Sequence, residues 1–80
     1  MPYIATFFSH FGATSFAKKL RGKGVSATPM PVPRKLSSSC GTCVRFEWEE
    51  AVEELATKEV EQIFKLEGDT AVLVFENHVE

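Results

Sequence analysis

The apolar residues of this chain change their period within the first 24 positions, and this change limits the folds open to it. Tyr3–Phe8 (YIATFF) is rich in β-branched and aromatic residues, which is typical of a buried strand. Ser9 then suits the N-cap of a helix. The next apolar residues recur at i, i+3, i+4 and i+7, the spacing of one helix face: Ala13, Phe16, Ala17 and Leu20. A strand and an amphipathic helix that stops near Gly24 predict mixed α and β structure.

The rest of the chain extends this pattern. We expect strands at Val25–Val32, Cys43–Trp48, Val60–Leu66 and Ala71–Glu76, and a second helix at Glu49–Thr57. Pro29, Pro31 and Pro33 cannot donate backbone hydrogen bonds, so the strand Val25–Val32 is expected to lie at a sheet edge or to become irregular towards its end. Gly68 and Asp69 indicate the last turn. The order predicts an α+β fold in one domain, residues 1–80: a ferredoxin-like βαββαβ sandwich with an extra C-terminal strand.

Several classes of protein are disfavoured by what the chain lacks. It has no run of eighteen apolar residues, and its start, MPYIATFFSH, has neither a basic leader nor a small-residue cleavage site. We therefore expect a cytoplasmic protein without a membrane span. The aromatic pair of an RNA-binding strand is missing, and the acidic second half would repel phosphate, so no nucleic-acid partner is expected. No P-loop, nucleophile elbow or dinucleotide fingerprint indicates a conventional enzyme or a cofactor.

Charge is segregated along the sequence. Residues 1–46 contain seven basic residues and no acidic one, whereas residues 47–80 contain all eleven acidic residues and only two basic ones, Lys58 and Lys65. In one interpretation, a basic helix lies beside an acidic helix and the two neutralise each other. In the other, the region around the cysteines is locally electropositive. The two interpretations are compatible.

The two cysteines lie in one small polar segment, SSSCGTCVRF, residues 37–46. In the cytoplasm, a close pair such as Cys40 and Cys43 is typical of redox, metal or sulfur chemistry rather than of a structural disulfide. The surrounding residues suit the stabilisation of a thiolate or another anion through hydroxyl groups, backbone N–H groups or positive charge: Arg34, Lys35, Ser37, Ser38, Ser39, Gly41 and Arg45. By strand alternation, Cys43 is expected to point away from Val44, towards the side of Arg45.

These motifs resemble a known family. The segments V-P-R (Val32–Arg34), S-S-S-C-G (Ser37–Gly41) and V-R-F (Val44–Phe46) are similar to those of the small bacterial domains called putative Se/S carrier-like proteins, over roughly residues 3–66. The resemblance implies a one-domain α+β fold that carries sulfur or selenium on a cysteine, with Cys40 as the carrier position. It also implies two partners, a donor of the desulfurase type and an acceptor protein.

Three functions remain open at this stage. The first is a sulfur or selenium carrier in which Cys40 holds the chalcogen as a persulfide-type adduct and Cys43 resolves or guards it. The second is a thiol–disulfide switch that uses Cys40 and Cys43, and the third is an interaction module that docks a partner on the edge strand Val25–Val32. A homodimer is compatible with all three, and two such pairs would offer four thiolates to zinc. His10 follows the first strand and has two interpretations: a surface or helix-cap histidine, which is the more common one, and a base that approaches the cysteine segment.

Overall fold

The structure, a computed structural model, describes residues 1–36 and 39–77. Ser37 and Ser38, two of the predicted site residues, lie outside the described residues, as do residues 78–80. The elements in chain order are β1 (Pro2–Phe7), α1 (His10–Gly22), β2 (Ala27–Pro31), β3 (Thr42–Glu47), the 3-10 turn η1 (Val52–Leu55), β4 (Val60–Glu67) and β5 (Thr70–Glu76).

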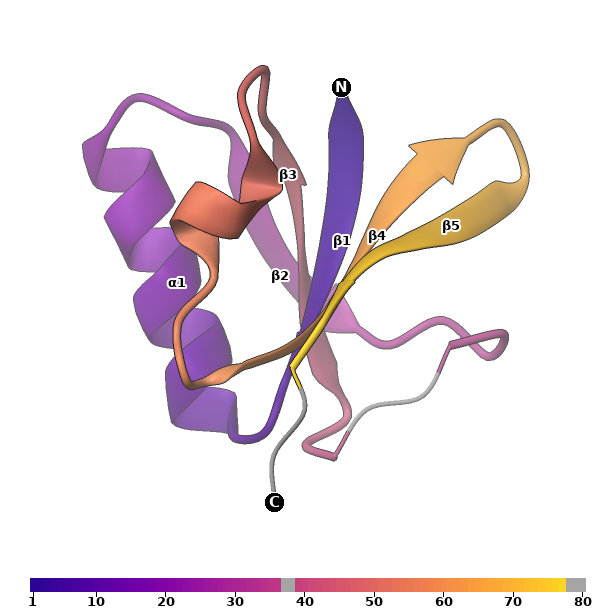
Figure 1. Cartoon of the computed structure of the whole chain (residues 1–80). Helices are drawn as coiled ribbons and strands as arrows, with labels where there is room; N and C mark the ends of the chain where they lie inside the picture. The colour runs from indigo at the N-terminus through magenta and orange to yellow at the C-terminus, as the bar shows by residue number, and fades with distance from the viewer. Residues whose placement is uncertain (37–38, 78–80) are drawn as a thin grey trace.

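The strands form one antiparallel sheet in the order β2-β3-β1-β4-β5, with α1 packed on one face (Figure 1). β1 is central because it pairs on both sides, and Ala5 lies opposite Val44 of β3 and Ile63 of β4. These three side chains share a face and belong to the buried core. The register of the sheet is therefore set by the residues that face α1.

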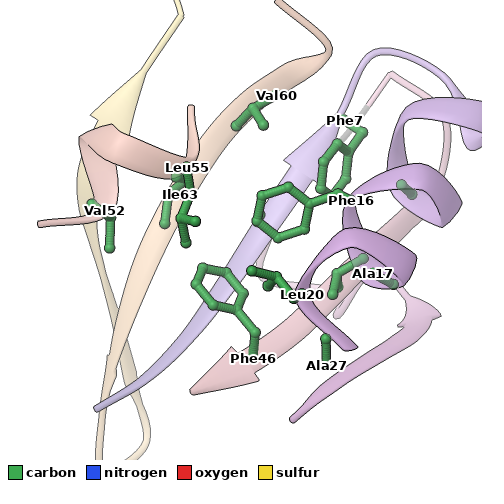
Figure 2. Close-up of a cluster of buried hydrophobic side chains, with 13 residues drawn as sticks. Phe7, Phe16, Ala17, Leu20, Ala27, Phe46, Val52, Leu55, Val60 and Ile63 are labelled. Carbon is green, nitrogen blue, oxygen red and sulfur yellow. The ribbon is translucent and has the colours of Figure 1, made fainter. Parts of the chain in front are cut away.

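The core lies between this face and α1, as Figure 2 shows. The predicted helix stripe is confirmed, since Ala13, Phe16, Ala17 and Leu20 are all buried. The ring centroid of Phe16 lies 5.1 Å from that of Phe7 and 5.3 Å from that of Phe46, in tilted and edge-on arrangements that aromatic pairs favour. The helix begins as predicted, with Ser9 Oγ accepting a hydrogen bond from the Gly12 N–H at 3.0 Å.

The prediction of an α+β fold is confirmed, but the prediction of a second helix is wrong. In place of Glu49–Thr57, the described chain has only the single turn η1, whose Val52 and Leu55 add to the core. A helix of this length is marginal without strong packing, and glutamates at positions 49 and 53, and again at 50 and 54, would repel each other one turn apart. The described residues thus form one α-helix and five strands, and the ferredoxin-like assignment stays a prediction.

The absence of a second helix also removes the predicted pairing of a basic helix with an acidic one. Within residues 1–36 and 39–77, the ion pairs join the N-terminal ammonium to Glu47 and Glu49, and Lys65 to Glu67. None of them involves a basic residue of α1. The basic face of α1 is therefore exposed to solvent rather than neutralised by the acidic segment.

The two edge strands of the sheet agree with the predictions made from the sequence. β2, with Pro29 and Pro31, is an edge strand, as its prolines predicted. At the other end, the predicted turn is present, with Gly68 at a φ of 62°, and it leads into the extra strand β5. No helix in the described part of the chain is long and apolar enough to cross a membrane.

The buried aromatic cluster yields a test of the core. Replacing Phe46 (1% exposed) by alanine should lower the free energy of unfolding by about 3–5 kcal/mol, because a ring-sized cavity opens among Phe16, Tyr3 and Leu20. Phe11→Ala is the matched control, since Phe11 is 73% exposed and should change the stability little. Urea unfolding followed by circular dichroism measures both variants, and equal losses would contradict this description of the core.

Candidate functional site around the two cysteines

Cys40 belongs to the loop between β2 (ending at Pro31) and β3 (starting at Thr42), and the first part of this loop lies over the sheet face opposite α1. Along β1, Ala5 points into the α1 core, so its neighbours Ile4 and Thr6 point to the other face, yet both are buried. Pro33 and Leu36 of the loop line a small cavity together with Ile4. Figure 1 shows the loop leaving β2 on the side of the sheet away from α1. Pro33 and Leu36 therefore cover part of this second face, beside Ile4.

Cys43 is one of the buried residues on this second face of the sheet. It lies on β3 opposite Thr6 of β1 and Met30 of β2, and its side chain is fully buried. As alternation predicted, Val44 joins the α1 core whereas Cys43 does not. Its Sγ donates a weak hydrogen bond to the Pro31 carbonyl oxygen at 3.7 Å. Burial raises the pKa of the Cys43 thiol, and the nearby Cys40 raises that pKa further, so Cys43 is held in the protonated form.

Cys40 lies just before β3 and is partly exposed, in contrast to Cys43. Its Sγ donates a hydrogen bond to the Thr42 carbonyl oxygen at 3.4 Å, and its side chain packs against the edge of the core. Gly41 allows this tight arrangement, since its φ of 75° lies in the left-handed region that side chains disfavour. The Gly41 carbonyl also accepts the Val32 N–H at 3.2 Å, which joins the two ends of the loop. The two thiols thus differ in solvent exposure, since Cys40 is partly exposed and Cys43 is buried.

The loop does present donors to an anion beside Cys40, but that anion is one of the chain's own carboxylates. Ser39 donates its backbone N–H to Glu61 Oε1 at 3.1 Å and its hydroxyl to Oε2 at 2.9 Å. Both oxygens of Glu61, at the start of β4, are thereby engaged by the residue that precedes Cys40. Sequence reasoning missed Glu61, because its position in an ordinary strand pattern carries no signal of a loop 22 residues away.

The beginning of α1 lies at the same end of the sheet. His10 Nδ1 is 3.3 Å from Thr42 Oγ1, which places this exposed histidine at the start of β3, two residues from Cys40 in sequence. Nearby, Ser9 Oγ donates to Glu59 Oε2 at 3.0 Å, which ties the segment before β4 to the start of the helix. Three separated parts of the chain therefore meet around Cys40: the start of α1, the start of β3 and the start of β4.

The predicted cations are distributed more widely than the sequence suggested. Lys35 Nζ donates to the Asp69 carbonyl oxygen at the turn between β4 and β5. Glu61 lies near the start of β4 and Glu67 at its end, just before this turn. Because a strand rises about 3.3 Å per residue, the turn lies about 20 Å along the strand from the carboxylate that contacts Ser39. Such a distance exceeds the screening length at physiological salt, and Lys35 therefore contributes little to the potential at Cys40.

The other two cations are on exposed positions. Arg45 lies on β3 two residues beyond Cys43, on the face that Cys43 shares, and pairs with Ile4 and Thr28 across the sheet. Arg34 is exposed on the loop. The structure therefore brings together Ser39, Cys40, Gly41 and Cys43 and spreads the three basic residues along the loop and the sheet. Among the described residues, no group of three or more His, Cys, Asp or Glu side chains is arranged to hold a metal ion.

Comparison with known proteins agrees with the motifs that carry this site. The family model described as "Putative Se/S carrier protein-like" matches residues 2–68, so the chain belongs to this family. The match includes both cysteines and the strands that position them, and it stops before β5. No curated protein and no solved structure matches the chain.

The contact between Ser39 and Glu61 yields the first prediction for the site. In Glu61→Gln, one of the two oxygens that accept from Ser39 becomes an NH2 group, which cannot accept, so the loop loses a charge-assisted contact that is solvent-exposed and contributes about 1 kcal/mol. We expect iodoacetamide to alkylate Cys40 about fivefold faster in this variant, as mass spectrometry of the reduced protein would measure. Glu54→Gln, at an exposed position on η1, is the control and should leave the rate unchanged. An unchanged rate in Glu61→Gln would contradict a restraining role for this carboxylate.

The second prediction concerns pH. Because the folded state raises the pKa of Cys43, mainly through burial, the neutral thiol is favoured below the ordinary thiol pKa and this stabilisation is lost as pH rises through the raised value. In Cys40→Ser, where burial still acts, alkylation of Cys43 should increase only above the ordinary thiol pKa of about 8.5. The same variant unfolded in urea should react with the ordinary profile. A folded-state midpoint at or below that of the unfolded chain would refute this description.

Proposed function

We propose that this protein carries sulfur or selenium as a persulfide-type adduct on Cys40. The observation that carries the proposal is the contrast between the two thiols within a member of the Se/S carrier-like family: Cys40 is partly exposed on a loop, whereas Cys43 is fully buried. A thiol that exchanges sulfur with two other proteins has to be reached by both of them. Of the two cysteines, Cys40 alone meets this requirement.

Loading would be a thiol exchange with the persulfide of a donor protein. The Cys40 thiolate attacks the terminal sulfur of the donor, a new bond forms between Cys40 Sγ and that sulfur, and the S–S bond of the donor breaks. The electron pair of the broken bond leaves with the donor's thiolate. No oxidant or reductant is consumed, and the same exchange with an acceptor thiolate unloads the carrier. Selenium can follow the same route, because a selenium-bearing adduct needs the same access and the same leaving thiolate.

Cys43 would act in this scheme as a resolving thiol that is kept unreactive. If the Cys43 thiolate attacked Cys40 Sγ of the loaded protein, a disulfide would form and the cargo would leave as hydrosulfide. Only the thiolate is an effective nucleophile, and burial holds the pKa of Cys43 high. The buried position therefore slows the loss of cargo while it keeps a second thiol close to the first.

That same closeness favours a second candidate function, a thiol–disulfide switch. Cys40 is near enough to raise the pKa of Cys43, which supports a pair able to oxidise when the loop opens. The carrier is preferred, because a switch would be served better by two accessible thiols of low pKa. In either case the expected setting is the cytoplasm, where thiols remain reduced, and the expected partners of the carrier are a donor of the desulfurase type and an acceptor protein.

Intact mass spectrometry tests the carrier against the switch. After incubation with a cysteine desulfurase and cysteine, the wild type should gain about the mass of one sulfur atom. Cys40→Ser should gain nothing. Cys43→Ser, in which the carrier thiol is intact, should gain the same mass and keep it for at least as long as the wild type.

Two results would count against the carrier. A loss of two hydrogens that requires both cysteines, with no gain of sulfur, would favour the switch. Equal loading of Cys40→Ser and the wild type would exclude Cys40 as the carrier thiol. Treatment with a thiol reductant should return the loaded protein to its original mass, which distinguishes a persulfide from irreversible oxidation.

A further inference from the structure

The two edge strands of the sheet differ in how well they are protected against pairing with another strand, and the carrier function does not depend on this difference. β5 forms one edge, and three consecutive large apolar residues on it are exposed: Val72 (40%), Leu73 (45%) and Val74 (38%). β5 contains no proline and no lysine, and its only charged residue is Glu76 at its end. Natural edge strands usually carry prolines, lysines or bulges that prevent pairing. β5 has only the irregularity of its register with β4 at Val74, so Thr70–Leu73 is an unprotected part of the edge.

The opposite edge, β2, is protected. The N–H of Val32 points towards β3, because it donates to the Gly41 carbonyl, and the Ser26 carbonyl points the same way, because it accepts from Glu47. Backbone groups alternate along a strand, so the nitrogens of Pro29 and Pro31 fall on the free side of β2. These nitrogens carry no hydrogen, and the free side of β2 lacks two donors that a further strand would require.

From this asymmetry we infer that the chain forms a homodimer in which β5 of one copy pairs antiparallel with β5 of a second copy, so that the sheet continues across the two subunits. Exposed apolar side chains on both faces of β5 support pairing along the edge rather than docking on one face. On β4, Val72 has Lys65 as its neighbour and Leu73 has Phe64, one on each face of the sheet. A second β5 beside the first adds apolar neighbours on both faces at once.

A second copy fits this edge because β5 is complementary to itself. Antiparallel pairing centred near Leu73 sets uncharged residues against one another from Ala71 to Phe75 and brings Glu76 opposite Thr70. The two Glu76 side chains are then roughly 20 Å apart at the two ends of the pair. Each Glu76 is also held against its own β4, since Gln62 Nε2 donates to Glu76 Oε2 at 2.9 Å. No like charges face each other in this arrangement.

The protected edge at β2 limits the assembly to two copies. Pairing of β5 with β2 of the next copy would be heterologous and would generate an open filament, but the prolines of β2 oppose it. Pairing of β5 with β5 has twofold symmetry and uses up both unprotected edges, so assembly stops at two copies. The regular part of β5 is Thr70–Leu73, because the register with β4 shifts between Leu73 and Phe75. We therefore expect a reversible dimer rather than a permanent one.

Sedimentation velocity on the full chain under a thiol reductant tests this inference, since the reductant excludes dimers linked through cysteine. The wild type should move from monomer to dimer as its concentration rises through the micromolar range, with no larger species. Leu73→Lys should remain monomeric over the same range, because two lysines would meet at the centre of the pair. Phe11→Lys is the control, as it removes an exposed apolar residue on α1, and it should dimerise like the wild type.

Circular dichroism of each variant verifies that the fold is retained. Should Leu73→Lys fail to fold, Val72→Lys provides the same test from the neighbouring position. A wild type that stays monomeric throughout, a Leu73→Lys variant that dimerises as well as the wild type, or growth into filaments would each overturn the inference. None of these readouts depends on sulfur loading, so the inference and the carrier function succeed or fail separately.

Discussion

A single helix can cover only one face of a five-stranded sheet, and the position of the thiols follows from this constraint. α1 and η1 bury one face of the sheet, on which Phe7, Phe46 and Ile63 lie. The other face still carries residues that require burial, among them Ile4 and Cys43. With no further helix in the described chain, Pro33 and Leu36 of the loop between β2 and β3 lie over part of that face beside Ile4, and Cys40 follows in the same loop. The loop that holds Cys40 thus also contributes to the packing of the sheet.

This double role gives the two cysteines different chemistry although they are only three residues apart. Cys43 belongs to β3, so its thiol is buried with the strand and ionises only at raised pH. Cys40 belongs to the loop before β3, where a glycine with positive φ turns the chain into the strand. The carboxylate of Glu61 engages Ser39, and the donors next to the exposed thiol are directed to an internal acceptor. A donor protein that approaches Cys40 would meet a restrained loop rather than a preformed pocket of positive charge.

The two sheet edges illustrate how local sequence acts at long range. Two prolines close the edge at β2, and their effect on pairing depends on which side of the strand their nitrogens occupy. β5 lies beyond the residues matched by the family model and leaves its apolar residues exposed on both faces. An edge of this kind is a hazard unless it has an occupant, because unpaired backbone groups beside apolar side chains favour pairing. A symmetric partner strand satisfies both groups at once.

The sequence by itself determined the elements that local periodicity and backbone chemistry decide. The apolar stripe of α1, its Ser9 cap, the edge position of β2, the turn at Gly68 and the extra strand were all predictable, because each depends on spacing or on a residue with restricted geometry. Only the tertiary structure decided the rest. The acidic segment 49–57 forms a single turn because its glutamates repel one another and too few of its residues pack. Lys35 contacts the turn at Asp69, and Glu61 contacts Ser39, the residue before Cys40. Contacts between residues this far apart in the chain depend on strand register, which no local pattern encodes.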